Sequence, residues 1–125
     1  MVVKEYDWVV LLAEDDVGVR NMVRRVLERA GFRVLAAADI VEALTFAYNY
    51  SHPIDILLID VDMPQIDGIS LAEHIKKVRP EILVLMMSGW LHSAGVHDVP
   101  AKVLAKPFSM QSLLETIRDL ILDAR

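Results

Sequence analysis

Short apolar runs alternate along this chain with segments whose apolar residues recur at helical spacing. Runs of this kind are typical of strands that are buried on both faces of a sheet. The expected strands are Trp8–Ala13, Arg33–Ala37, Ile54–Ile59, Ile82–Met87 and Lys102–Ala105. Strict alternation of strand and helix predicts an α/β fold: a doubly wound parallel sheet with right-handed crossovers and helices on both faces.

The segments between the strands carry the apolar stripe of amphipathic helices. We expect the first helix to begin near Val19 and to end at Gly31, with its arginines on a solvated face. Asp39 and Ser109 are suited to cap the second and the last helix. Residues 89–100 contain glycine and proline and leave room for only a short or irregular fourth helix.

The bulk properties exclude several classes of protein. A chain of 125 residues fits one domain, which we expect to cover residues 1–125. The net charge of −5 argues against nonspecific binding of nucleic acid, and the lack of cysteine excludes thiolate metal sites. No apolar run reaches the roughly 18 residues that span a bilayer. The first residues, MVVKEYDW, do not resemble a secretory signal, so we expect a cytoplasmic protein.

Polar side chains follow four of the five predicted strands, at the point where each strand ends. They are Glu14 and Asp15 after the first strand, Asp60 and Asp62 after the third, Ser88 after the fourth and Lys106 after the fifth. In a doubly wound sheet with strand order 2-1-3-4-5, these four strands lie side by side. Their carboxyl ends would then bring all of these side chains to one edge of the sheet.

This set of groups predicts phosphoryl transfer. Clustered carboxylates repel one another, and Mg²⁺, which prefers oxygen ligands, relieves the conflict between Glu14, Asp15 and Asp60. Lys106 and Ser88 would stabilise the oxygens of a transferred phosphoryl group, with Asp60 as the nucleophile. Singly these residues would be ordinary turn, cap or surface residues, and we assign Asp16 to capping the first helix. The functional interpretation depends on their occurring together.

The same residues lie in motifs that resemble a known family. The motifs are LLAEDD, IDILLIDVDMPQIDG, LVLMMSG and LAKPF, in this order and each at the end of a predicted strand. Together they resemble the receiver domain of the two-component response regulators, of the chemotaxis-regulator type, over nearly the whole chain. The resemblance implies a flavodoxin-like (βα)5 three-layer sandwich.

The resemblance also implies roles for individual residues. Asp60 would accept a phosphoryl group from a sensor histidine kinase or phosphotransfer protein, and Ser88 and Lys106 would bind the phosphoryl oxygens. Asp15 would bind Mg²⁺ directly, Glu14 through water, and Asp62 through its backbone carbonyl. The Lys106–Pro107 peptide would be cis. Apart from its own phosphorylation and dephosphorylation, the domain would not be an enzyme, and it would act as a monomer or weak dimer on an unknown downstream protein.

Two features depart from the family pattern. Val103 stands where family members usually carry an aromatic residue three positions before the lysine, and the segment before it is short. Trp90 follows Ser88 by two residues, and we expect its bulk to slow the water that hydrolyses the phosphoryl group. Gly68 is expected to lie in a turn that requires positive φ.

Two alternative functions stay open at this point. One is a protein-binding module in which phosphorylation is vestigial, which the change at Val103 would allow. The other is a phosphatase of the haloacid-dehalogenase type, because Asp60-Val61-Asp62 resembles the DxD motif of those enzymes. In those enzymes, however, DxD follows the first strand and the metal-binding acids come last, and the present chain has no room for a substrate cap.

Overall fold

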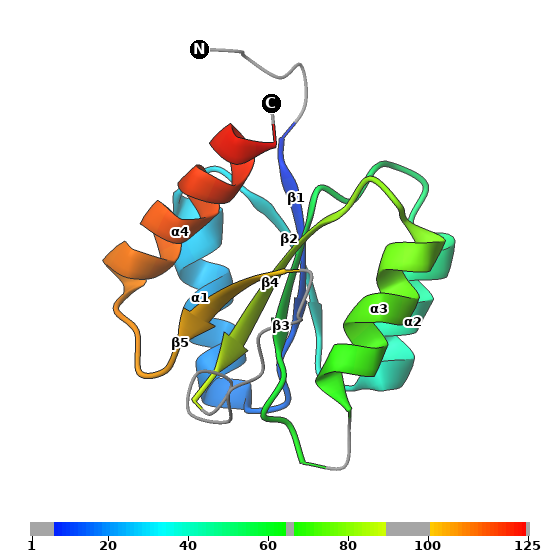
Figure 1. Cartoon of the computed structure of the whole chain (residues 1–125), viewed down its shortest axis with the longest axis horizontal. Helices are drawn as coiled ribbons and strands as arrows, with labels where there is room; N and C mark the ends of the chain where they lie inside the picture. Colours follow the sequence, from blue (N-terminus) through cyan, green and yellow to red (C-terminus); the bar gives the residue numbers. More distant parts are fainter. Residues whose placement is uncertain (1–6, 65–66, 90–100, 125) are drawn as a thin grey trace.

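A parallel sheet forms the centre of the structure, a computed structural model that describes residues 7–64, 67–89 and 101–124. Its five strands lie in the order β2-β1-β3-β4-β5, which confirms the predicted order (Figure 1). They are β1 (Val9–Ala13), β2 (Arg33–Ala37), β3 (Ile56–Asp60), β4 (Leu83–Ser88) and β5 (Lys102–Ala105). All neighbouring strands are parallel, so their carboxyl ends lie at one edge of the sheet.

Helices cover both faces of this sheet. In the described residues they are α1 (Val17–Arg29), α2 (Ile40–Asn49), α3 (Gly68–Val78) and α4 (Met110–Asp123). Helices α1 and α4 lie on one face and α2 and α3 on the other, which gives the predicted three-layer sandwich (Figure 1). Among the described residues, none of these helices has the length and apolar character needed to cross a bilayer. The expected short fourth helix falls at residues 89–100, and residues 90–100 lie outside the described part of the chain.

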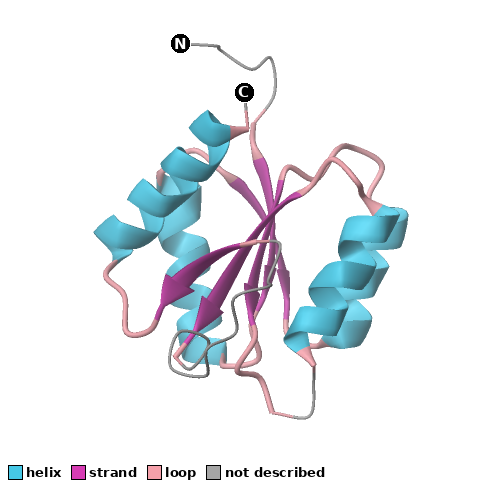
Figure 2. Cartoon of the chain, viewed as in Figure 1, coloured by secondary structure: helices cyan, strands magenta, loops and turns pink. Residues whose placement is uncertain are grey.

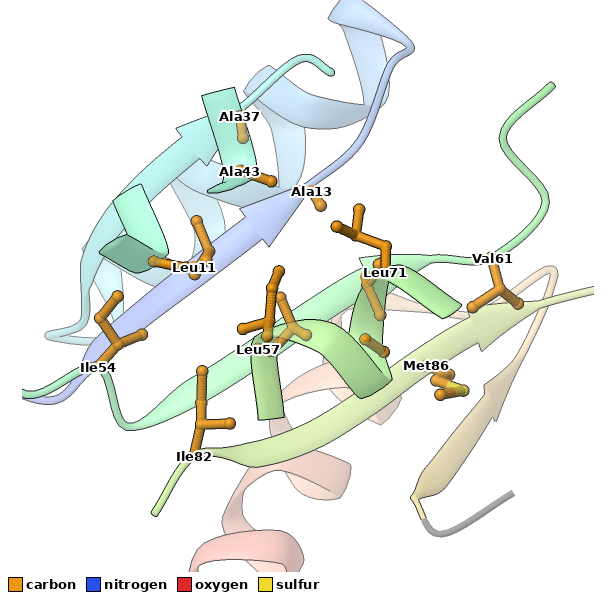
Figure 3. Packing of buried hydrophobic residues seen from close by; sticks show 14 of the residues in the cluster. Leu11, Ala13, Ala37, Ala43, Ile54, Leu57, Val61, Leu71, Ile82 and Met86 are labelled. Carbon is orange, nitrogen blue, oxygen red and sulfur yellow. The ribbon is translucent and has the colours of Figure 1, made fainter. Parts of the chain in front are cut away.

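The sheet divides the apolar interior into two cores. Neighbouring residues of a strand point to opposite faces, so Leu11 and Leu57 belong to the core beneath α2 and α3, whereas Leu12 and Leu58 belong to the core beneath α1 and α4. Figure 3 shows the first of these cores. Strands β1 and β3 are buried along their whole length. A strand that faces a core on both sides carries apolar side chains throughout, which explains the runs in the sequence.

Short polar side chains begin the helices. The side chains of Asp16, Asp39 and Ser109 accept hydrogen bonds from backbone N–H groups in the first turns of α1, α2 and α4, which confirms the three predicted caps. Asp67 does the same for α3. Gly31 follows α1 with φ of 99°, the left-handed conformation that glycine adopts freely, so this residue ends the helix as predicted.

The expectation for Gly68 was wrong. Gly68 is the first residue of α3 and does not have positive φ. Its lack of a side chain has a steric reason instead, because a Cβ atom there would lie 2.7 Å from the Cα of Val61. Glycine therefore allows the start of α3 to lie directly against the residue that follows β3.

Arg79, just after α3, connects the ends of two helices. Its guanidinium donates hydrogen bonds of 2.8 Å to the carbonyl oxygens of Ala47 and His52 and a further bond to that of Tyr50. These carbonyl groups lie at the end of α2 and in the loop that follows it. A single arginine thus satisfies backbone acceptors that the helix itself leaves without partners.

We expect Arg79→Met to lower the free energy of unfolding by about 2 kcal/mol, because three carbonyl groups lose a charged donor while the apolar contacts of the side chain are retained. Urea unfolding of the purified domain measures this loss. Arg79→Lys is the matched control, since it keeps the charge but not the fork of donors, and should lose less. A loss below about 0.5 kcal/mol for Arg79→Met, the range of ordinary surface substitutions, would contradict this assignment.

An acidic site at the carboxyl edge of the sheet

The predicted site residues lie at the edge of the sheet to which all the strand arrowheads point (Figure 2). Glu14 directly follows β1, Asp60 is the last residue of β3, Ser88 is the last residue of β4 and Lys106 directly follows β5. The backbone N–H of Lys106 donates a 2.9 Å hydrogen bond to the carbonyl oxygen of Ser88, which holds the last two ends together. The parallel topology therefore brings these side chains to one edge of the sheet, as the sequence predicted.

Three carboxylates meet at this edge. One carboxylate oxygen each from Glu14, Asp15 and Asp60 lies within 4.8 Å of the other two. Glu14 and Asp60 are only 2% and 4% exposed, whereas Asp15 is exposed. Two buried acids with a third at the surface form a site that opens toward solvent on one side.

The environment of Glu14 is unfavourable for its charge. Burial, a hydrogen bond with Asp60 and the negative charge of Asp60 raise the pKa of Glu14 from 4.5 to about 8. Its Oε2 atom is buried without a hydrogen-bond partner among the described residues. A hard divalent cation would supply the missing partner and relieve the repulsion, so the three carboxylates fit a magnesium ion.

Lys106 lies between two acids. Its Nζ is 2.7 Å from Oδ1 of Asp60 and 3.3 Å from Oδ2 of Asp62. Burial by itself would lower the pKa of Lys106, but the hydrogen bond and the charge of Asp60, together with Asp62, raise it overall. The backbone N–H of Asp62 also donates to Oδ1 of Asp60, at 2.8 Å. One oxygen of Asp60 is therefore held by two donors, which fixes the orientation of the carboxylate.

The side chain of Asp62 has partners that the sequence did not predict. Its Oδ1 accepts a 3.0 Å hydrogen bond from the Ser88 hydroxyl, and its Oδ2 accepts a 2.8 Å bond from the backbone N–H of Gly89. Burial would raise the pKa of Asp62, but these bonds and the charge of Lys106 outweigh it and hold the pKa below its usual range. The role predicted for the Asp62 backbone carbonyl as a metal ligand stays a prediction.

Arg20 is another residue whose contribution we had not predicted. The arginines of α1 were expected to form a solvated face, but Nη1 of Arg20 donates to the carbonyl oxygens of Glu14, at 2.9 Å, and Asp15, at 3.3 Å. This arginine stabilises the turn that carries two of the acids. Its position six residues after Glu14, one helical turn into α1, was the only signal in the sequence.

Three further positions singled out in the sequence have different outcomes. The Lys106–Pro107 peptide bond is cis, which confirms the implication of the family resemblance. Val103 lies on β5 opposite Met86 and packs against the core beneath α2 and α3. Trp90 lies outside the described residues, so its expected effect on hydrolysis stays a prediction.

Comparison with known proteins identifies the family. Residues 10–118 match the family model described as the response regulator receiver domain. The chain belongs to this family. It is a receiver domain of two-component phosphorelay signalling, and this match leaves the phosphatase alternative without support.

The relatives place the domain in different contexts. The chain is 33% identical over 119 residues to the response regulator receiver protein CpdR of Brucella abortus, covering 92% of this chain and 98% of CpdR. It is 35% identical over 116 residues to the sensor kinase CckA of the same organism, covering 90% of this chain but only 12% of that relative. It spans about half the length of the response regulator MprA of several mycobacteria.

Solved receiver structures resemble the chain closely. The chemotaxis response regulator CheY4 of Vibrio cholerae superimposes with a TM-score of 0.80 at 28% identity, covering 91% of this chain and 98% of CheY4. The receiver domain of the hybrid histidine kinase CckA gives a TM-score of 0.77 at 32% identity, with 90% and 97% covered. These likenesses confirm the predicted fold class.

The raised pKa of Glu14 leads to a prediction about pH. The folded state holds the proton of Glu14 more tightly than the unfolded state, so unfolding releases it between pH 4.5 and about 8. In chelator, the free energy of unfolding should therefore fall as the pH rises through this range, and the stabilisation should be fully present only below pH 4.5. Urea unfolding at a series of pH values measures the slope.

Glu14→Gln is the control for this slope. It cannot ionise, and every other titratable side chain is present in both proteins, so the difference between the two slopes isolates Glu14. Equal slopes for the wild type and Glu14→Gln would show that Glu14 does not retain a proton in the folded protein.

Proposed function

We propose that Asp60 is the phosphoryl acceptor of this receiver domain and that a phosphohistidine on a sensor kinase or phosphotransfer protein is the donor. The observation that carries the proposal is the Lys106 ammonium 2.7 Å from a buried Asp60, whose carboxylate also lies within 4.8 Å of those of Glu14 and Asp15. One oxygen of Asp60 is held by donors, which leaves the other oxygen to react.

The phosphoryl transfer to Asp60 is a simple displacement at phosphorus. A carboxylate oxygen of Asp60 forms a bond to phosphorus while the bond between phosphorus and the imidazole nitrogen breaks. The electron pair of the broken bond stays on that nitrogen, and the imidazole leaves as a neutral ring when its other nitrogen carries a proton. Lys106 and Ser88 stabilise the charge on the phosphoryl oxygens.

Glu14, Asp15 and Asp60 would hold a magnesium ion, with the backbone carbonyl of Asp62 as a further ligand. The bound ion supplies positive charge against the phosphoryl oxygens. The domain itself would promote both the gain and the loss of the phosphoryl group at Asp60, without acting on any other substrate. We also propose that the domain lies in the cytoplasm, as the sequence predicts.

Phosphorylation would shift the domain between two conformations, one of which a downstream protein recognises. Val103 is smaller than the aromatic residue usual in the family, so we infer that this chain reports the change through a different packing at β5. A monomer or weak dimer is sufficient for such a switch.

Incubation with acetyl phosphate and a magnesium salt should add one phosphoryl group to the wild type and none to Asp60→Asn, as measured by intact mass spectrometry. The reason is that Asp60 is the buried carboxylate that lies both against Lys106 and beside Glu14 and Asp15. Asp16→Asn is the matched control, because it removes a neighbouring carboxylate but leaves the site intact. Persistent modification of folded Asp60→Asn would refute the assignment.

The metal site gives a separate prediction. Asp15→Asn should weaken Mg²⁺ binding at least about tenfold, since loss of even an outer-shell partner commonly costs that much. Asp16→Asn should bind Mg²⁺ like the wild type, because asparagine caps α1 as well as aspartate does. Isothermal titration calorimetry measures both affinities. If the two variants lose affinity equally, the acidic turn contributes only diffuse charge.

A further inference from the structure

The carboxylate of Asp62 is bound by donors from three places at the carboxyl edge of the sheet. The Ser88 hydroxyl donates to it at 3.0 Å and the backbone N–H of Gly89 at 2.8 Å, while the Lys106 ammonium lies 3.3 Å away. Two of these donors, Ser88 and Lys106, are the groups that the proposed function assigns to the phosphoryl oxygens. Asp62 itself lies in the turn after β3, outside the helices and strands of the described residues.

The position of Asp62 makes it a direct competitor for these donors. Lys106 contacts the carboxylates of Asp60 and Asp62 at once, so the Asp62 carboxylate lies beside the acceptor. A phosphoryl group on Asp60 presents further anionic oxygens at the same place. Two anions cannot share one ammonium, one hydroxyl and one N–H group without strong repulsion.

We propose that the Asp62 carboxylate occupies the phosphoryl-binding donors of the unphosphorylated protein and has to leave them when a phosphoryl group or an analogue binds at Asp60. This inference rests on the proposed function. It makes Asp62 the residue that sets how readily the site accepts the phosphoryl group.

The surroundings of Asp62 allow such an exchange. Its side chain is 24% exposed, so a rotation about the Cα–Cβ bond brings the carboxylate into water. The backbone N–H of Asp62 is bonded separately to Asp60, and this bond does not depend on where the side chain points. The exchange therefore needs no change in the backbone that holds the acceptor.

If the Asp62 carboxylate occupies the donors in most molecules, only the remaining molecules can bind the phosphoryl group. The apparent affinity is then the intrinsic affinity multiplied by the fraction of molecules whose donors are unoccupied. A purely structural role for Asp62, as a connection between the loop after β3 and the end of β4, has the opposite consequence. In that case removal of the carboxylate would loosen the site and weaken anion binding. The two roles therefore differ in the direction of one measurement.

The measurement is the dissociation constant of beryllofluoride, a phosphoryl analogue that is not turned over, at a Mg²⁺ concentration shown to saturate each variant. ¹⁹F NMR detects the bound analogue directly. Asp62→Ala should bind it about tenfold more tightly than the wild type, because loss of the carboxylate frees charge-assisted donors. Asp62→Asn should show a smaller gain, since its amide oxygen still accepts hydrogen bonds. Asp16→Asn, with the same change in charge, should bind like the wild type.

A second measurement follows the displacement itself. The amide proton of Gly89 should shift in Asp62→Ala before any ligand is added, because it loses its carboxylate acceptor. On addition of beryllofluoride the wild type and Asp62→Ala should converge on the same Gly89 shift, since the analogue becomes the acceptor in both. The isosteric Asp62→Asn serves both measurements if Asp62→Ala does not fold.

The outcomes separate this inference from the proposed function. Unchanged or weaker binding of beryllofluoride by the folded Asp62 variants overturns the inference and leaves Asp60 as the acceptor. Binding by Asp62→Ala but not by the wild type supports the inference in its strongest form. Absence of binding in every folded variant overturns both.

Discussion

The placement of one ammonium group between two carboxylates is the interaction on which the site depends. Lys106 neutralises part of the charge of Asp60 and of Asp62, while Glu14 and Asp15 add negative charge nearby. The site can hold this excess of acid because β1 and β3 are buried throughout and fix Glu14 and Asp60 at their ends. The two apolar cores on either side of the sheet therefore stabilise the positions of these acids as well as the fold.

Most of the fold could be predicted because strands that lie inside the sheet consist of short runs of apolar residues. The limits of β2 and β5 agree with the prediction, and the order of the sheet follows from the alternation. The prediction began β3 two residues early, at Ile54. This residue lies before the strand but is buried in the core beneath α2 and α3. An apolar run in the sequence indicates which residues are buried. Buried residues can lie beyond the part of the chain that pairs in the sheet.

The site could be predicted in its residue types but not in its contacts. Parallel topology alone brings the ends of β1, β3, β4 and β5 together, so Glu14, Asp60, Ser88 and Lys106 were found from their positions. The spacing of residues in the sequence does not predict the direction in which a side chain points at that edge of the sheet. Asp62 turns toward Ser88 and Gly89, and Arg20 turns back toward the carbonyl groups of the acidic turn. Both orientations depend on tertiary neighbours that only the folded chain supplies.

The close approach at Gly68 has a mechanical consequence. The first residue of α3 leaves less than the width of a methyl group between its backbone and that of Val61, the residue after β3. A displacement of the chain just beyond Asp60 toward α3 therefore cannot be absorbed by a gap and has to push the helix along with it. The smallest amino acid thus puts the chain that follows Asp60 in direct contact with α3, which lies at the surface of the domain.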